Sequence, residues 1–165
     1  MTSEVIGDYV MGRIGDKGLA IATWIAIIGT LAVNTLSNLF PIDGNTVADL
    51  ANGPLGGVLI TPANYAFIIW GVIYVGLIAY AWYQSRRKQR GQLIIRRINV
   101  CLIIACAAQM VWIYLFTLQL YWLSVVAMAG ILLALIVAYS ELEDGQHFAD
   151  SRRRKMVHGP ISIYL

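Results

Sequence analysis

The feature that most limits what this chain can fold into is a set of four long apolar runs, none of which carries a charged side chain. They cover residues 18–40, 64–84, 98–117 and 120–140. A helix needs roughly 20 residues to cross a hydrocarbon core about 30 Å thick, and each run reaches that length. The apolar residues are continuous and do not alternate, which indicates spanning helices and not the strands of a barrel.

The composition agrees with a bilayer as the solvent. Of the 165 residues 59% are hydrophobic and only 13% are charged, with a mean hydropathy of +0.68. A soluble domain of this length needs far more polar surface. We therefore predict an all-α integral membrane bundle with four complete transmembrane helices and the start of a fifth.

The chain divides into an N-terminal segment, residues 1–17, and a single transmembrane bundle domain, residues 18–165. Apolar residues at helical spacing in the first segment predict a short interfacial helix. The fifth helix begins at about residue 159, and the stretch 159–165 is too short to cross a bilayer. We therefore expect the sequence to be a fragment or a truncated product of a longer chain.

The basic residues predict the orientation. All twelve Lys and Arg lie in residues 1–17, 85–97 and 141–158, which four spans would place on one side of the membrane. The positive-inside rule then predicts a cytoplasmic N-terminus and an outward-facing connection at 41–63. We expect the bacterial inner (plasma) membrane. Binding of anionic lipid is a second, weaker interpretation of the same basic clusters.

Aromatic side chains form a stripe in the second run. On a helix, Phe67, Trp70 and Tyr74 fall within about 60° of one another and extend over roughly 10 Å of depth. A simple interfacial belt would keep its rings at one depth. The third run repeats the spacing with Gln109, Trp112 and Phe116.

Polar side chains gather on one side of the first run, within an arc of about 100°. They can serve as interhelical hydrogen bonds or as ligand contacts, because polar residues in spans usually face the bundle interior. Together with the aromatic residues they lie in the outer half, beneath the Gly-rich connection 41–63. We predict a polar-aromatic chamber with a flexible lid, whose ligand-binding residues are Asn34, Asn38, Phe67, Trp70, Tyr74, Gln109, Trp112 and Phe116.

Enzymatic function is not expected, because all nine acidic residues and both histidines lie outside the runs. Cys101 and Cys106 point about 140° apart on a helix and show no metal-ligand spacing. The expected partners are membrane lipid and a hydrophobic small molecule, and no nucleic acid. A ridge of small residues, Gly130, Ala134 and Ala138, allows another helix to approach closely, either within the bundle or across a homodimer.

Two motifs resemble the TspO/MBR family of tryptophan-rich sensory proteins, related to the translocator protein (peripheral benzodiazepine receptor). The stretch Pro62-x-x-Tyr65-x-Phe67-x-x-Trp70-x-x-x-Tyr74 is similar to the family pattern Pro-Pro-x-Trp-x-Phe-x-x-x-Trp-x-x-x-Tyr. Here Tyr65 replaces Trp, Thr61 replaces the first Pro, and the Phe-to-Trp gap is one residue shorter. Gln109-x-x-Trp112-x-x-x-Phe116 resembles the family's Asn-x-x-Trp-x-x-x-Phe. The resemblance covers about residues 18–140.

The resemblance implies a five-helix membrane bundle whose long first loop closes a pocket for porphyrins, haem-like tetrapyrroles and sterols. It implies that Trp70, Tyr74 and Trp112 contact the ligand, with no cofactor required and a porphyrin or haem-like molecule as a candidate ligand. The leading hypothesis is a sensory or binding protein that regulates or transports such molecules. The alternative is a fragment of a multi-pass transporter, in which Asn and Gln line a solute path.

Overall fold

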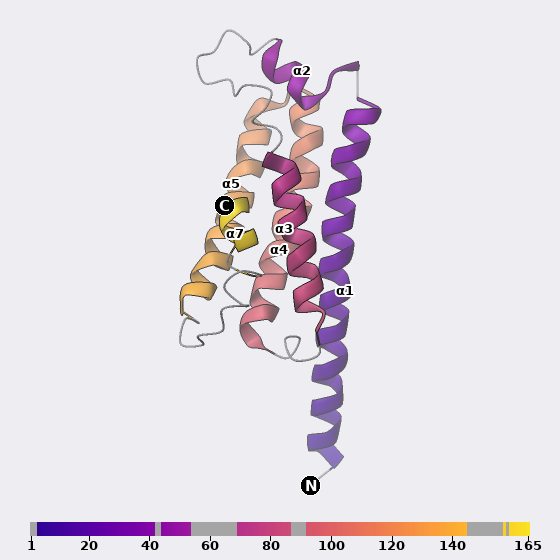
Figure 1. Cartoon of the computed structure of the whole chain (residues 1–165), viewed down its shortest axis with the longest axis vertical. Helices are drawn as coiled ribbons and strands as arrows, with labels where there is room; N and C mark the ends of the chain where they lie inside the picture. Colours follow the sequence, from indigo (N-terminus) through magenta and orange to yellow (C-terminus); the bar gives the residue numbers. More distant parts are fainter. Residues whose placement is uncertain (1–2, 42–43, 54–68, 87–91, 145–156, 158) are drawn as a thin grey trace.

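The computed structural model describes residues 3–41, 44–53, 69–86, 92–144, 157 and 159–165, and every regular element in these ranges is helical. The all-α prediction is therefore confirmed for the described part of the chain. The helices are α1 (Ser3–Leu39), α2 (Val47–Asn52), α3 (Ile69–Gln84), α4 (Leu93–Thr117), α5 (Tyr121–Asp144) and α7 (Gly159–Tyr164), shown in Figure 1.

Three helices are long and apolar enough to cross a membrane: Gly15–Leu39, Leu93–Thr117 and Tyr121–Leu142. They coincide with three of the predicted runs. The predicted run 64–84 is represented by α3, an apolar helix of 16 residues, and residues 64–68 lie outside the described ranges. Its first residues therefore remain a prediction.

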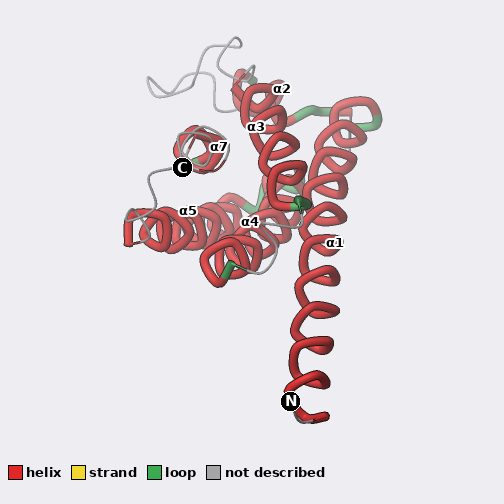
Figure 2. The backbone as a smooth tube through the Cα atoms, turned by 60° about the horizontal axis from the view of Figure 1, so that its bottom comes forward, coloured by secondary structure: helices red, strands yellow, loops and turns green. Residues whose placement is uncertain are grey.

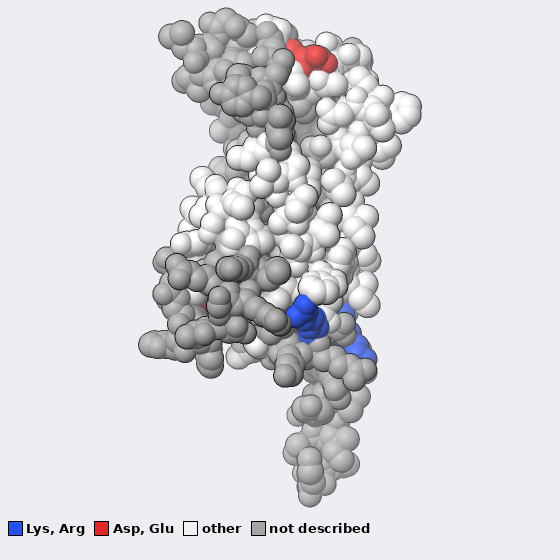
Figure 3. Space-filling view, viewed as in Figure 1, with Lys and Arg blue, Asp and Glu red and all other residues white. Residues whose placement is uncertain are grey.

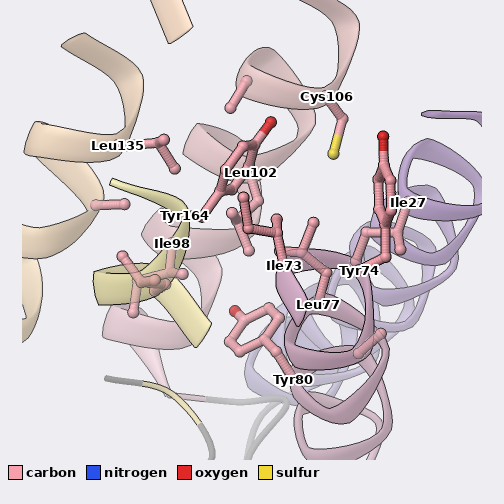
Figure 4. Packing of buried hydrophobic residues seen from close by; sticks show 14 of the residues in the cluster. Ile27, Ile73, Tyr74, Leu77, Tyr80, Ile98, Leu102, Cys106, Leu135 and Tyr164 are labelled. Carbon is pink, nitrogen blue, oxygen red and sulfur yellow. The ribbon is translucent and has the colours of Figure 1, made fainter. Parts of the chain in front are cut away.

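The bundle is organised around α4, which packs against both α1 and α5, while α3 packs against α1 and α7 (Figures 1 and 2). The buried core contains the aliphatic residues Ile27, Leu77, Ile98, Leu102 and Leu135, packed with Tyr74, Tyr80 and Tyr164 (Figure 4), and it also includes Ile161. Large apolar side chains such as Val75, Ile104 and Val126 are exposed on the outside of the helices. Lipid tails are as apolar as these side chains, so a bilayer solvates them without penalty.

The N-terminal segment differs from its prediction. The expected short interfacial helix is not a separate element, because α1 runs without a break from Ser3 to Leu39 and extends beyond the rest of the bundle (Figure 1). The segment contains no proline, and a glycine inside a helix costs only about 1 kcal/mol relative to alanine. Nothing in the local sequence is therefore strong enough to end the helix before the apolar run begins.

The connection expected to be a flexible lid contains the short helix α2. Thr46 and Asp49 form a capping box: the Asp49 amide donates a 3.1 Å hydrogen bond to Thr46 Oγ1, and the Thr46 amide donates one of 2.9 Å to Asp49 Oδ2. Leu50 and Ala51 are buried, and α2 contacts α4 at one end of the bundle (Figure 1). In the described residues 44–53 the connection is therefore an ordered cap.

The last helix, α7, begins where the fifth helix was predicted. Its buried side chains, Pro160, Ile161 and Tyr164, face the bundle, and the helix packs against α3 and α5. The approach to α3 is close at Gly76, where an added Cβ would lie 3.2 Å from Pro160 Cβ. A glycine at this position therefore allows the two helices to meet.

Candidate functional site

Five aromatic rings lie in successive contact near the α2 end of the bundle. Trp70 and Trp112 are stacked, with centroids 6.1 Å apart and planes inclined by 28°. Tyr74 lies 6.4 Å from Trp70, Phe116 lies 5.5 Å from Trp112, and Tyr121 meets Phe116 edge-on at 5.8 Å. We call these five residues the aromatic row.

The helical repeat explains the row. Trp70 and Tyr74 are four residues apart on α3, and Trp112 and Phe116 are four residues apart on α4, so each pair shares one helix face. Where the two helices meet, the faces bring Trp70 against Trp112. Centroid separations of about 4.5–7 Å are those at which aromatic pairs attract, with about 0.5–1.5 kcal/mol per pair beyond simple burial.

Two buried polar atoms beside the row, the Tyr74 hydroxyl and Gln109 Nε2, have no hydrogen-bond partner among the residues that the structure describes. Tyr74 is only 7% exposed and Gln109 only 1%. The other end of the Gln109 amide is engaged, since the Tyr164 hydroxyl donates a 3.4 Å hydrogen bond to Gln109 Oε1. A buried donor left unpaired costs about 1–3 kcal/mol. Both atoms can donate to a bound molecule that presents a hydrogen-bond acceptor.

A second contact joins α1 to the same region. Thr30 Oγ1 lies 2.9 Å from Ala26 O on its own helix and 3.2 Å from Cys106 O on α4. Figure 4 shows the Cys106 sulfur directed into the space between Tyr74 and Tyr164. The hydrogen bond supports an interhelical role for Thr30, which was one of the two interpretations of the polar arc on the first run.

The family follows from a comparison of the whole sequence. A family model described as TSPO-like protein matches residues 20–165. The chain belongs to the TSPO-like family. Searches of curated proteins and of solved structures give no match. The matched range includes every described helix apart from the beginning of α1, so the resemblance seen in two motifs extends through α7.

The TSPO-like bundle brings together five of the eight predicted site residues: Trp70, Tyr74, Gln109, Trp112 and Phe116. The predicted residue Phe67 lies outside the described ranges.

The two predicted asparagines of α1 are placed differently. Asn38 is exposed, and its Nδ2 donates a 2.7 Å hydrogen bond to Asn34 O within the same helix. Asn34 is half-buried, and among the described residues neither side chain has a hydrogen bond to α3 or α4. An amide near a helix end can reach a backbone carbonyl of its own helix, and it then needs no partner across the bundle.

Two members of this TSPO-like site were not expected from the sequence. Tyr121 was not among the predicted site residues, but it extends the aromatic row because the tight turn after α4 brings the start of α5 beside Phe116. Tyr164 was not considered, since a run of seven residues gives little indication of where its side chains will pack. Its contact with Gln109 depends on the docking of α7 against α3.

Proposed function

We propose that this TSPO-like protein binds porphyrins, other tetrapyrroles or sterol-like molecules within the membrane, at the aromatic row, and that it senses them or takes part in their transport. The observation that carries the proposal is the stacked Trp70–Trp112 pair with the unpaired Tyr74 hydroxyl and Gln109 Nε2 beside it. Aromatic faces suit a flat apolar ligand, and a few buried donors fix its orientation. The role is one of binding and not of catalysis.

The proposed orientation follows from charge. Described Lys and Arg side chains gather at the end of the bundle opposite α2 (Figure 3). By the positive-inside rule that end, which we call the basic end, faces the cytoplasm of a bacterial inner membrane. The aromatic row then lies in the outer half of the bilayer.

The packing below the row favours a closed site over a path for polar solutes. Ile27, Leu77 and Leu102 are each at most 1% exposed, and along their helices they lie between the row and the basic end. Such a dry aliphatic layer offers no hydrogen bonds to a polar molecule moving through the bundle. The layer supports a binding protein over the alternative of a fragment of a solute transporter.

Titration with protoporphyrin IX tests the proposal. The protein, reconstituted in lipid nanodiscs, should show saturable quenching of tryptophan fluorescence, and Trp70→Leu and Trp112→Leu should each raise the midpoint about tenfold, as expected for the loss of about 1.4 kcal/mol. Trp122→Leu is the matched control, because Trp122 is 88% exposed on α5. Midpoints are compared, since each variant also loses one fluorophore.

The result that would overturn the proposal is a midpoint unchanged in both Trp70→Leu and Trp112→Leu. A second assay addresses the alternative function. Uptake of a polar solute into proteoliposomes, unaffected by either substitution, would favour the transporter fragment.

A further inference from the structure

A stripe of exposed side chains runs down the outer face of α3 towards the basic end. Val75, Ile78 and Trp82 are 69%, 40% and 57% exposed, and Arg86 is the second residue after the helix, which ends at Gln84. At 100° per residue the three helical positions fall within about 60° of one another, and the Arg86 guanidinium lies over the Trp82 ring. We call these four residues the α3 stripe.

The stripe ends in a cation with a defined position. The Arg86 guanidinium carbon lies 4.2 Å from the centroid of the Trp82 ring, which is the geometry of a cation–π contact. Stacking uses the flat face of the guanidinium and leaves the N–H groups along its edge able to donate. A planar fork of this kind suits the oxygen atoms of a phosphate.

Two other arginines in the described part of the chain, Arg96 and Arg97, each have an acidic partner. Arg97 Nη1 lies 2.9 Å from Glu141 Oε1, and Arg96 Nη1 lies 4.0 Å from Asp16 Oδ1. No acidic partner is found for Arg86 among the residues that the structure describes. Within the described residues it therefore differs from Arg96 and Arg97, which each lie beside a carboxylate.

The end of α3 is fixed against α1. Trp24 Nε1 donates a 2.8 Å hydrogen bond to Ser85 Oγ, and Gln84 Nε2 donates one of 3.2 Å to Ala20 O. These contacts are made by the two residues immediately before Arg86, so the backbone that leads into Arg86 is held against α1. The site is therefore a feature of the folded bundle.

We propose that the α3 stripe binds an anionic phospholipid, with its phosphate on Arg86 and an acyl chain along Val75, Ile78 and Trp82. The stripe passes from aliphatic to aromatic to cationic side chains, and these match in turn the acyl chain, the interfacial region and the anionic phosphate of a phospholipid. Tryptophan prefers the membrane interface, and a cation there attracts anionic headgroups. Trp82 lies twelve residues from Trp70, about 18 Å along the helix, so this site is separate from the aromatic row.

Native mass spectrometry of the detergent-solubilised protein tests the assignment. With phosphatidylglycerol or phosphatidylcholine added at equal concentration, the wild-type protein should retain the anionic lipid about fivefold more, the scale of one favourable cation. Arg86→Gln should bring that ratio close to one. Arg86→Lys keeps the charge and should keep most of the preference. Arg97→Gln is the matched control and should leave the ratio unchanged.

Two outcomes would overturn the proposal. One is equal retention of the two lipids by the wild-type protein. The other is a loss of preference in Arg97→Gln as large as that in Arg86→Gln, which would indicate a diffuse effect of net charge. A competition arm with inorganic phosphate separates lipid from free anion, and displacement of phosphatidylglycerol by an equal concentration of phosphate would also refute the lipid assignment.

Discussion

The Tyr80 hydroxyl on α3 donates a 2.6 Å hydrogen bond to Asn99 Oδ1 on α4, at a point where both side chains are buried. Asn99 Nδ2 in turn donates to Gln84 Oε1 at 2.9 Å, and Gln84 Nε2 donates to Ala20 O at 3.2 Å. This polar network joins α1, α3 and α4 near the basic end. The network's side chains hydrogen-bond to one another and to a backbone carbonyl. It therefore fixes how α1, α3 and α4 are rotated about their axes without leaving these buried groups unpaired.

Asn99→Leu should destabilise the bundle, because leucine of similar size leaves the Tyr80 hydroxyl and Gln84 Oε1 buried without partners. The expected loss is about 1–3 kcal/mol, measured as the shift in the denaturant unfolding midpoint in detergent micelles. Tyr80→Phe removes one donor only and should cost about 1 kcal/mol or less, as is usual for hydrogen bonds between membrane helices.

The control for this experiment is Thr35→Val. Thr35 is exposed, and its hydroxyl donates only to Leu31 O of the same helix. Its unfolding midpoint should match that of the wild-type protein. If Asn99→Leu were equally neutral, the network would contribute nothing to the stability of the bundle.

Gly76→Leu should separate α7 from α3. A Cβ at this position would already lie 3.3 Å from Pro160 Cα, and the rest of a leucine side chain would enter the space of α7. Overpacking of this kind typically costs about 1–3 kcal/mol. Thermal unfolding in detergent measures the loss. Gly130→Leu serves as the matched control, since nothing lies within 4 Å of a Cβ placed there, and equal melting temperatures for the two variants would refute the close approach.

How much of the fold could be predicted depends on whether the sequence pattern for each feature lies within a single helix. The three candidate spans and the meeting of Trp70 with Trp112 were predictable, because apolar run length and the 3.6-residue repeat are properties of each helix alone. The capping box of α2 in the connection 41–63 could also have been found, since Thr46 followed three residues later by Asp49 resembles a capping box in the sequence itself.

The remaining features depend on how helices are rotated against one another. The polar network needs side chains from α3 and α4 and a carbonyl from α1 to face a common point, and no single helix encodes that angle. In the same way, the hydrogen bond from Tyr164 to Gln109 depends on the close contact at Gly76. Asn38 was predicted to face a ligand because it lies on the polar arc of the first run. In the structure its side chain donates a hydrogen bond within its own helix.

The docking of α2 should weaken at low pH. The side-chain and backbone hydrogen bonds of Thr46 lower the pKa of Asp49 below its ordinary value of 3.8. A carboxyl whose pKa is lower in the folded state contributes stability that is fully present above the unfolded pKa. That contribution is lost as the pH falls from 3.8 through the lower folded value.

Hydrogen exchange of the backbone amides of residues 47–53 in nanodiscs measures this loss. Exchange corrected for its intrinsic pH dependence should rise below pH 3.8 in the wild-type protein. Asp49→Asn cannot ionise, so it should exchange faster at neutral pH and show a flat profile through the same window. A wild-type profile as flat as that of Asp49→Asn would mean that the capping box does not hold α2.

Tyr74→Phe should lower the affinity for ligand without lowering the stability of the ligand-free protein. The substitution removes one of the two buried polar atoms that lack a partner in the described part of the chain, and it keeps the ring that contacts Trp70. Without ligand the variant should be as stable as the wild-type protein or more stable, by up to the penalty of about 1–3 kcal/mol for an unpaired buried group. Its affinity for protoporphyrin IX should nevertheless fall, by about tenfold or more, because a hydrogen bond to a charged acceptor contributes about 1.5–3 kcal/mol.

The comparison that isolates this hydrogen bond uses two porphyrins. Octaethylporphyrin has the same flat ring as protoporphyrin IX and lacks its two carboxylates, so it offers no charged acceptor to the Tyr74 hydroxyl. Wild-type protein and Tyr74→Phe should therefore bind octaethylporphyrin equally and differ only for protoporphyrin IX. An equal loss of affinity for both ligands would show that the hydroxyl acts by shaping the site, and a lower stability of the ligand-free variant would show that the hydroxyl already has a partner within the protein.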